Sequence, residues 1–305
     1  MLDITRKRVS LRTARAEALV RAEPATLRMI REGTIPKGSV EDVTRAAALL
    51  GIKNTPALLP FCHPIPIERG TVRCEIEQRG VRVIVEVAAI ARTGVEVEAM
   101  TAAAIGALNV YDMIKPVDGT ALIESVRLVE KRGGKSDHRE TFASPPRAGV
   151  LVASDSVAAG RAEDGTGPAL REALAAHGVE VAALEVVPDE IETIRERVRR
   201  WVDDERLDLV FVAGGTGLGP RDVTPEALEP LIERPLPGVA EALRAHGRER
   251  TPHANLGRNV AGARGGAVIV ATGGSPRAAT EALDALMPWL LHALEVREEG
   301  FRHGD

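Results

Sequence analysis

The residues Ala143-Ser144-Pro145-Pro146 separate two stretches of this sequence that have different hydrophobic patterns. Consecutive prolines after a polar stretch are typical of a linker, because proline interrupts both helices and central strands. A chain of 305 residues is also long enough for two domains. We therefore predict one domain over residues 1–142, a linker over 143–148 and a second domain over 149–305.

The first stretch mixes helical and strand patterns. Some segments repeat apolar residues at helical spacing, whereas others alternate or are rich in β-branched residues around a turn that predicts an antiparallel hairpin. In chain order we predict helices at 12–22 and 40–50, strands at 71–77 and 81–89, a helix at 98–113 and a strand at 122–129. This order favours an α+β domain, ferredoxin-like, in which helices cover one face of an antiparallel sheet.

The second stretch alternates strands with helices. In chain order we predict a strand at 149–153, a helix at 167–177, a strand at 179–187, a helix at 190–202, strands at 209–213 and 267–271, and a helix at 276–293. This alternation predicts an α/β domain with three layers, a mostly parallel sheet between two layers of helices. In such sheets ligands bind beyond the carboxyl ends of the strands.

Composition limits the possible classes of function. No apolar run approaches the roughly 20 residues that span a bilayer, and the N-terminus has no apolar signal segment, so we expect a cytoplasmic protein without a membrane partner. A net charge of -4 and an aromatic content of 2% argue against nucleic acid partners. Cys62 and Cys74 are too few for a disulfide framework and lack metal-ligand spacing.

Lysine is rare in this arginine-rich chain, which has six lysines against 34 arginines. An ammonium group can lose its proton in a buried site, whereas a guanidinium effectively cannot, so the lysines are candidates for proton transfer. Chance retention is the alternative for any single lysine. The six are Lys7, Lys37, Lys53, Lys115, Lys131 and Lys135.

Three loops in the second domain follow predicted strands and carry small or hydroxyl residues. Glycine allows backbone N–H groups to approach phosphate oxygens closely, although glycine-rich turns are also common without a ligand. The candidate binding residues are Asp155 and Ser156 in the first loop, Gly214, Gly215, Thr216 and Gly217 in the second, and Gly274, Ser275 and Pro276 in the third.

Two acidic residues lie beside these loops. Asp222 stands between the glycine loop and a predicted helix start, where Thr224 would be the N-cap and Pro225 the first helical residue. A carboxylate at this place could hold Mg²⁺ against the phosphates of a nucleotide. Asp189 follows the strand that ends at Val187, and its structural alternative is an N-cap for the next helix.

The run GGTGLGPRDVTPEAL and the earlier run SDSVAAGRAEDGTGPAL resemble the molybdopterin adenylyltransferase family, over nearly all of residues 149–294. The resemblance implies transfer of AMP from ATP to molybdopterin, with Mg²⁺ as cofactor, ATP as co-substrate and pyrophosphate as a product. It implies that Asp189 and Asp222 are catalytic and that Asp222 holds the metal. A subgroup of this family binds molybdopterin without evident catalysis. Gly257 and the loop at 272–273 depart from the common pattern and favour that alternative.

In the first domain, prolines on both sides of Cys62 and His63 exclude a helix and restrict the backbone there. Adjacent residues rarely form a nucleophile pair, so we interpret Cys62 as structural. Farther along, Glu96 and Glu98 point the same way if the segment is extended and diverge if it is helical. Asp112 and Lys115 are three residues apart, and their structural alternative is a surface ion pair. Of these residues, Lys115 is the more notable because lysine is rare here.

The runs FCHPIPI, TGVEVEAMTAAAIGALNVYDMIK and VRLVEKRGGKS resemble the cyclic pyranopterin monophosphate synthase family, over about residues 2–135. The resemblance implies conversion of (8S)-3',8-cyclo-7,8-dihydroguanosine 5'-triphosphate to cyclic pyranopterin monophosphate and pyrophosphate. Whether this site needs a metal is left open. The implied catalytic residues are Lys37, Asp112 and Lys115, and the implied substrate-binding residues are Arg12, Phe61, Cys62, His63, Glu96, Val97, Glu98 and Lys135.

Together the two resemblances imply a bifunctional enzyme of molybdenum cofactor biosynthesis that acts on small molecules. Its two reactions are not consecutive, because sulfur must be added before molybdopterin exists, so channelling between the sites is not implied. The families also imply a homo-oligomer, a trimer or a hexamer with threefold and twofold axes. A carrier role for the second domain stays open. A nucleotide-sensing regulator is disfavoured by the lack of a DNA-reading motif.

Overall fold

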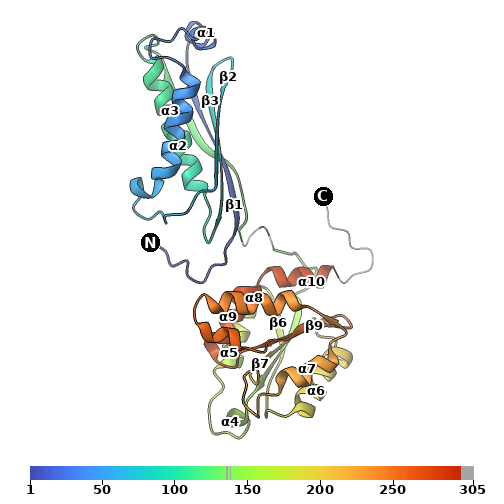
Figure 1. The fold of residues 1–305 in the computed structure, drawn as a ribbon. Helices are drawn as coiled ribbons and strands as arrows, with labels where there is room; N and C mark the ends of the chain where they lie inside the picture. Colours follow the sequence, from blue (N-terminus) through green and yellow to red (C-terminus); the bar gives the residue numbers. More distant parts are fainter. Residues whose placement is uncertain (135–136, 138, 297–305) are drawn as a thin grey trace. The chain divides into compact units, whose positions relative to one another are not determined.

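The computed structural model describes residues 1–134, 137 and 139–296 of the chain. These form two compact units, Met1–Asp137 and His138–Asp305 (Figure 1). The first strand of the second unit, β5 (Arg147–Ala153), begins inside the stretch 143–148 that the proline pattern predicts as a linker. Within the described residues, no helix has both the length and the apolar character needed to cross a bilayer.

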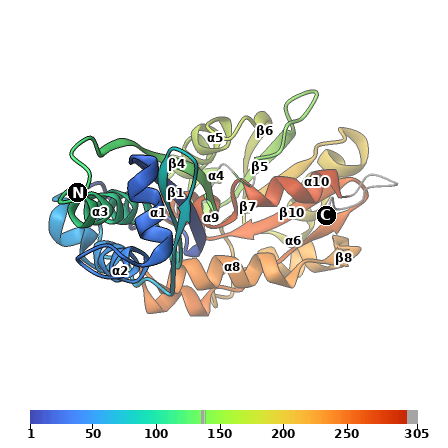
Figure 2. The same ribbon diagram turned by 90° about the horizontal axis from the view of Figure 1, so that it is seen from above.

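The first unit is an antiparallel four-stranded sheet, in the order β2-β3-β1-β4, with helices on one face. Its elements are β1 (Ser10–Arg21), α1 (Pro24–Glu32), α2 (Val40–Leu58), β2 (Arg69–Ile76), β3 (Gly80–Ala91), α3 (Glu96–Ile114) and β4 (Leu122–Arg132). Figure 2 looks nearly along α2 and α3 and places them side by side. The predicted α+β class is therefore confirmed.

One predicted helix of this unit is wrong, because residues 12–22 belong to the central strand β1. Ala14, Ala16, Ala18 and Val20 alternate along this strand and are all buried against the helices. Alanine and arginine favour helices in isolation, but the period of two fits a strand that pairs with β3 and β4 at the same time. Tertiary pairing overrides the local propensity here.

Helices α2 and α3 approach each other closely because small residues line their contact. A Cβ atom on Gly51 would lie 3.1 Å from the Cα of Ala102, which leaves no room for a larger residue. The neighbouring Ala99 and Ala103 are fully buried as well. Since α3 begins at Glu96, both Glu96 and Glu98 are helical and their side chains diverge.

The second unit contains a six-stranded sheet in the order β6-β5-β7-β10-β9-β8, in which the first four strands are parallel. Its strands are β5 (Arg147–Ala153), β6 (Glu180–Val187), β7 (Leu209–Ala213), β8 (Arg234–Pro235), β9 (Ala261–Arg264) and β10 (Ala267–Thr272). Its helices are α4 (Asp155–Ala158), α5 (Thr166–Ala175), α6 (Ile191–Arg199), α7 (Thr224–Leu228), α8 (Pro237–Arg248), α9 (Pro276–Leu286) and α10 (His292–Glu295).

Two hydrophobic clusters cover the two faces of this sheet. Alternate residues of β7 contribute to opposite clusters, with Phe211 on one face and Val212 on the other. Helices α5, α8 and α9 pack on the first face and α6 and α7 on the second (Figure 1). The predicted three-layer α/β class is confirmed. The last long helix ends at Leu286, before the predicted end, because Pro288 follows.

His246 on α8 is a buried group that makes the stability of this unit depend on pH. Its side chain is 6% exposed and its Nε2 has no hydrogen-bond partner in the described structure. Burial lowers the pKa of His246, and the nearby Arg250 lowers it further. The folded state therefore takes up this proton less readily than the unfolded state, whose histidine pKa is about 6.5. Stability is complete above that pH and falls as the pH drops below it.

We expect the melting temperature of the second unit to fall by a few degrees between pH 7 and pH 5, at about 2–4 °C per kcal/mol. His246→Gln should reduce this pH dependence, because glutamine does not titrate. Tryptophan fluorescence measures the transition selectively, since both tryptophans, Trp201 and Trp289, lie in this unit. An unchanged pH dependence in the variant would contradict the assignment to His246.

Candidate active sites

In the second unit, the loops after β5, β7 and β10 meet at the carboxyl edge of the sheet. Gly214 donates its N–H to the Thr272 carbonyl over 3.1 Å, and the Thr166 hydroxyl donates to the Gly274 carbonyl over 2.7 Å. A Cβ on Gly274 would lie 2.9 Å from the Gly214 Cα, so the second and third loops touch. After β5 the chain passes first to β6 and then to β7 on the opposite side, which makes this edge a topological switch point, the usual ligand site of such sheets.

The backbone of the glycine loop requires glycine at its first two positions. Gly214 and Gly215 have φ values of 109° and 60°, a region that other residues rarely adopt. The buried Thr224 hydroxyl donates to the Gly214 carbonyl over 2.7 Å, and the Thr224 N–H donates to the Gly215 carbonyl over 3.0 Å. The N-cap prediction for Thr224 is therefore wrong. Val223 precedes the helix, and Thr224 holds the loop instead.

Arg258 fixes the other end of the glycine loop. Its backbone N–H donates to the Thr216 carbonyl over 3.0 Å and its Nε donates to the Gly217 carbonyl over 2.8 Å. Its guanidinium also donates to the Asp222 carbonyl and pairs with Glu226. The loop is thus preformed, with its geometry set by side chains from both flanks.

Asp155 and Asp189 connect the ends of β5 and β6 through reciprocal hydrogen bonds. The Asp155 N–H donates to Asp189 Oδ2 over 2.9 Å, and the Asp189 N–H donates to Asp155 Oδ1 over 3.0 Å. Asp189 is not an N-cap, because Glu190 holds that position at the start of α6. Its Oδ1 is buried without a hydrogen-bond partner among the described residues. Burial raises the pKa of Asp189, and the charges of Asp155 and Asp222 raise it further.

Asp222 and Asp189 both face the glycine loop. Asp222 Oδ2 accepts the Gly219 N–H over 2.7 Å and lies 2.7 Å from the position of a Cβ on Gly217. Asp189 Oδ1 lies 3.0 Å from the corresponding position on Gly215. Carboxylate oxygens are the ligands that Mg²⁺ prefers, and the orphaned Oδ1 has a free acceptor site for one. These two acids therefore fit a divalent cation beside a bound phosphate.

The remaining predicted residues of this edge have mainly structural contacts. The Ser156 hydroxyl lies 3.2 Å from that of Ser154, which caps α4. Ser275 caps α9 by accepting the Ala278 N–H over 3.2 Å, and Pro276 is the first residue of that helix. The Ser275 side chain therefore satisfies one backbone donor at this helix start, and Pro276 has no N–H to satisfy.

In the first unit, Asp112 lies between two lysines at the end of α3. Lys37 Nζ is 2.6 Å from Asp112 Oδ2 and Lys115 Nζ is 2.7 Å from Oδ1. Lys37 also donates to the Asp112 carbonyl over 2.8 Å. Hydrogen bonds from Lys115 and Lys37 lower the pKa of Asp112 to about 2, so this carboxyl is ionised at neutral pH. The ion pair between Asp112 and Lys115, which the sequence offered as the structural alternative, is present, and Lys37 forms a second ion pair with the same carboxylate.

A second cluster lies at the opposite end of α3. Cys62 donates its S–H to Glu98 Oε1 over 3.4 Å, and Glu96 pairs with Lys131 over 3.1 Å. Arg12 lies near Glu96. Burial lowers the pKa of Arg12, and the charge of Glu96 raises it. The Arg12 Nε donates to the Ala91 carbonyl over 3.4 Å. Phe61 and Val97 are exposed beside this cluster, His63 is half-buried, and Lys135 lies outside the described residues.

The structure does not bring the two clusters of one chain together. Glu98 and Asp112 are 14 positions apart in the same helix. At about 1.5 Å per residue, roughly 21 Å of helix separates them. Lys131 is one of the six lysines noted in the sequence as candidates, but the residues implied by the family resemblance did not include it.

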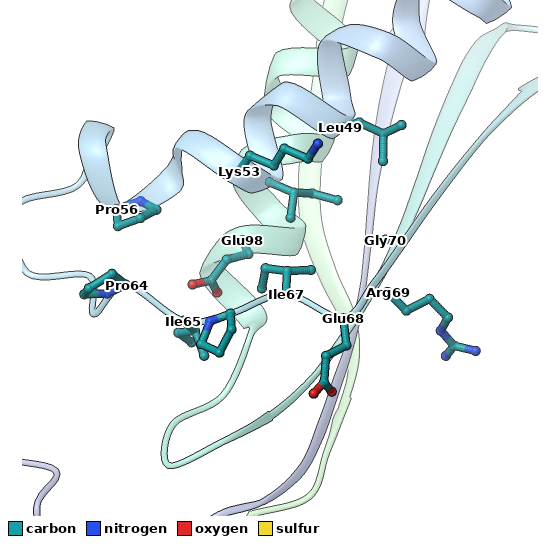
Figure 3. Close-up of a pocket in the computed structure, with 12 residues that line it drawn as sticks. Leu49, Lys53, Pro56, Pro64, Ile65, Ile67, Glu68, Arg69, Gly70 and Glu98 are labelled. Carbon is teal, nitrogen blue, oxygen red and sulfur yellow. The ribbon is translucent and has the colours of Figure 1, made fainter.

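A cavity of about 620 Å³ lies between α2 and the segment 64–70 (Figure 3). Its wall is mostly apolar, with residues such as Ile52 and Ile67, and Lys53 lies at its border. Glu98 projects into it from α3, is only 2% exposed, and has an Oε2 without a hydrogen-bond partner in the described structure. Burial raises the pKa of Glu98, and the charge of Glu96 raises it further. Lys53 is likewise one of the six candidate lysines that the family resemblance did not assign to the site.

Cys62 is expected to be chemically inert. Burial and the neighbouring Glu98 raise the pKa of its thiol from 9.0 to about 11, and burial does the same for Cys74. Such a shift lowers the reactive thiolate population about 100-fold at pH 8. Alkylation by iodoacetamide, followed by mass spectrometry, should be slower than for free cysteine by that order at both positions. Rapid modification of Cys62 alone would instead indicate a nucleophile.

Comparisons with known proteins match both units. Residues 1–134 match the MoaC family model, and residues 149–292 match the model described as "Probable molybdopterin binding domain". The "Molybdenum cofactor biosynthesis bifunctional protein" of Chlorobaculum tepidum is 39% identical over 296 residues, which are 97% of this chain and 94% of that protein.

Two further relatives each correspond to part of the chain. The "Cyclic pyranopterin monophosphate synthase" of Methylobacterium sp. strain 4-46 is 44% identical over 138 residues, which are 45% of this chain and 86% of that protein. The crystal structure of a molybdopterin biosynthesis enzyme, MoaB, from Thermus thermophilus is 49% identical and has a TM-score of 0.48. The match covers 49% of this chain and 94% of the Thermus chain.

Proposed function

The chain belongs to the family of bifunctional molybdenum cofactor biosynthesis proteins, and we propose that it catalyses two separate reactions of that pathway. The first unit forms cyclic pyranopterin monophosphate, in keeping with the synthase that it resembles. The second unit transfers AMP from Mg-ATP to molybdopterin. Both reactions release pyrophosphate, and each uses the residues of its own unit.

In the first unit, we propose that Lys37, Asp112 and Lys115 transfer protons to and from the substrate during the ring rearrangement. That rearrangement needs a proton acceptor and a proton donor at adjacent positions. Asp112 supplies an ionised carboxylate, and Lys115, 2.7 Å from it, supplies an ammonium as the proton donor, whose pKa is raised by its hydrogen bond with Asp112. Lys37 and the cationic Arg12 provide charge for the triphosphate. Glu98 is placed to hold the ring N–H groups.

Because the two clusters lie at opposite ends of α3, we propose that the complete site forms between two copies of the chain. The Asp112 cluster of one copy would then face the Glu98 cluster of its partner. Mixing Asp112→Asn with Glu98→Gln chains should restore part of the activity that each variant lacks alone. A stable monomer at micromolar concentration, or no restoration after mixing, would contradict this arrangement.

In the second unit, the observation that carries the proposal is the pair Asp189 and Asp222 beside the glycine loop. A loop that only bound molybdopterin would not need two carboxylates, which repel phosphate unless a cation is present. Mg²⁺ held by Asp222 and Asp189 would neutralise the phosphate charge that develops during transfer. The loop N–H groups of Gly215, Thr216 and Gly217 would orient the phosphates, whereas the Gly214 N–H is bonded to the Thr272 carbonyl.

Pyrophosphate release tests both halves of this proposal with one readout. The purified chain should release pyrophosphate from the cyclised guanosine triphosphate alone. It should release pyrophosphate from Mg-ATP only when molybdopterin is present. Release from the first substrate but not from the second, with molybdopterin still bound, would make the second unit a carrier.

A further inference from the structure

Arg221 joins two of the loops at the carboxyl edge of the second unit. Its Nε donates to Asp155 Oδ2 and its Nη2 donates to Asp155 Oδ1, each over 2.8 Å. Arg221 follows the glycine loop after β7, whereas Asp155 follows β5. This bidentate pair therefore links the loops after β5 and β7 beside the predicted phosphate loop.

Asp155 is fixed independently of Arg221. Its backbone N–H donates to Asp189 and its Oδ1 accepts the Asp189 N–H. Hydrogen bonds from the Arg221 side chain and the Asp189 backbone lower the pKa of Asp155 to about 2, so the carboxylate is charged at neutral pH. The arginine is the movable partner, because its side chain is 58% exposed against 35% for Asp155.

An exposed ion pair of this kind contributes little net stability, so another anion can replace the carboxylate. Phosphate presents the same two-oxygen geometry to a guanidinium and carries more charge. Arg258, which also lies at this edge, is committed to the carbonyls of Gly217 and Asp222 and to Glu226. Arg221 does not hold the loop backbone in this way, because its side-chain hydrogen bonds within the described structure go to Asp155 alone.

The position of Arg221 also fits the charge balance of the edge. Asp155, Asp189 and Asp222 place three carboxylates around the loop, and their repulsion contributes to the raised pKa of Asp189. A triphosphate adds further negative charge and needs a cation that can turn toward it. The Arg221 side chain is 58% exposed, so it can turn toward phosphates that extend beyond the glycine loop.

We propose that Arg221 binds the terminal phosphates of the nucleotide and that Asp155 holds it in position between turnovers. This inference rests on the proposed nucleotide transfer. On binding, the guanidinium exchanges the Asp155 carboxylate for phosphate oxygens, with no covalent change. Arg221 thus selects triphosphates over monophosphates.

The test is the affinity of the full chain for Mg-ATP and for AMP, measured by calorimetry for wild type and Arg221→Gln. We expect at least tenfold weaker binding of Mg-ATP and less than twofold change for AMP. Arg21→Gln is the matched control, because Arg21 forms a similar exposed bidentate pair with Glu124 in the first unit. It should bind both nucleotides like wild type.

Several outcomes would overturn the inference, its premise or the proposed reaction. Mg-ATP binding within twofold of wild type in Arg221→Gln would exclude a phosphate contact. Equal losses for Mg-ATP and AMP, or a changed tryptophan melting transition, would make Arg221 a structural residue. A wild-type chain that binds no ATP would overturn nucleotide transfer itself. A wild-type chain that binds Mg-ATP without transferring AMP would refute only the proposed reaction.

Discussion

Asp112→Asn is expected to reduce the formation of cyclic pyranopterin monophosphate roughly 10²–10⁴-fold, the usual contribution of one acid–base group. The amide keeps the shape of the side chain but cannot accept a proton or neutralise Lys37 and Lys115, which lie 2.6 and 2.7 Å from the carboxylate. Binding of the triphosphate should remain, because both lysines are retained. Product formation and substrate binding can be measured separately by single-turnover kinetics and calorimetry.

Lys115→Arg distinguishes proton exchange from simple charge. Arginine keeps the positive charge beside Asp112, but its guanidinium stays protonated. A loss of activity comparable to that of Asp112→Asn is therefore expected. Near-normal turnover would reduce Lys115 to a phosphate contact, and loss of substrate binding in Asp112→Asn would make that residue structural. Asp42→Asn, at an exposed acid in the first turn of α2, is the matched control and should behave like wild type.

Asp222→Asn is expected to reduce AMP transfer by a similar factor, at least 10²-fold, because the residue loses the charge proposed to hold the metal. The asparagine oxygen can still accept the Gly219 N–H that Asp222 Oδ2 accepts over 2.7 Å, so the loop should keep its structure. Molybdopterin binding should stay within a few fold of wild type. Transfer can be followed with ATP labelled in the α-phosphate.

Asp204→Asn provides the control for that variant. Asp204 is exposed and lies before β7, at the opposite end of the strand from Asp222. It should transfer AMP at the wild-type rate. Full activity in Asp222→Asn would exclude Asp222 as the metal ligand. Asp189 would then be the candidate ligand.

The fold of the second unit could be predicted from sequence because its strands are short, apolar and separated by amphipathic helices. The loops after β5, β7 and β10 followed from the same pattern, since parallel strands end at one edge. The hydrogen bonds between the loops at that edge could not be predicted from the sequence. The reciprocal bonds between Asp155 and Asp189, and the role of Thr224 in holding the loop rather than capping a helix, depend on tertiary contacts.

The first unit was harder to predict. Residues 10–21 carry alanine and arginine, which favour a helix locally, and only pairing with β3 and β4 makes them a strand. The motif around Asp112 pointed to Lys115, because lysine is rare and a proline ends the helix there. Lys37 entered the site only through the family resemblance, and its contact with Asp112 depends on tertiary packing. The distance between Asp112 and Glu98 along α3 could not be judged while Glu96 to Glu98 was open to an extended interpretation.

The most direct test of two independent active sites in one chain is a crossed assay of pyrophosphate release. Wild type, Asp112→Asn and Asp222→Asn would each be supplied with the cyclised guanosine triphosphate, and separately with Mg-ATP and molybdopterin. Two independent sites predict that Asp112→Asn loses only the first activity and Asp222→Asn only the second. Loss of both activities from one substitution, or a wild-type chain that bound molybdopterin and never transferred AMP, would contradict two independent sites.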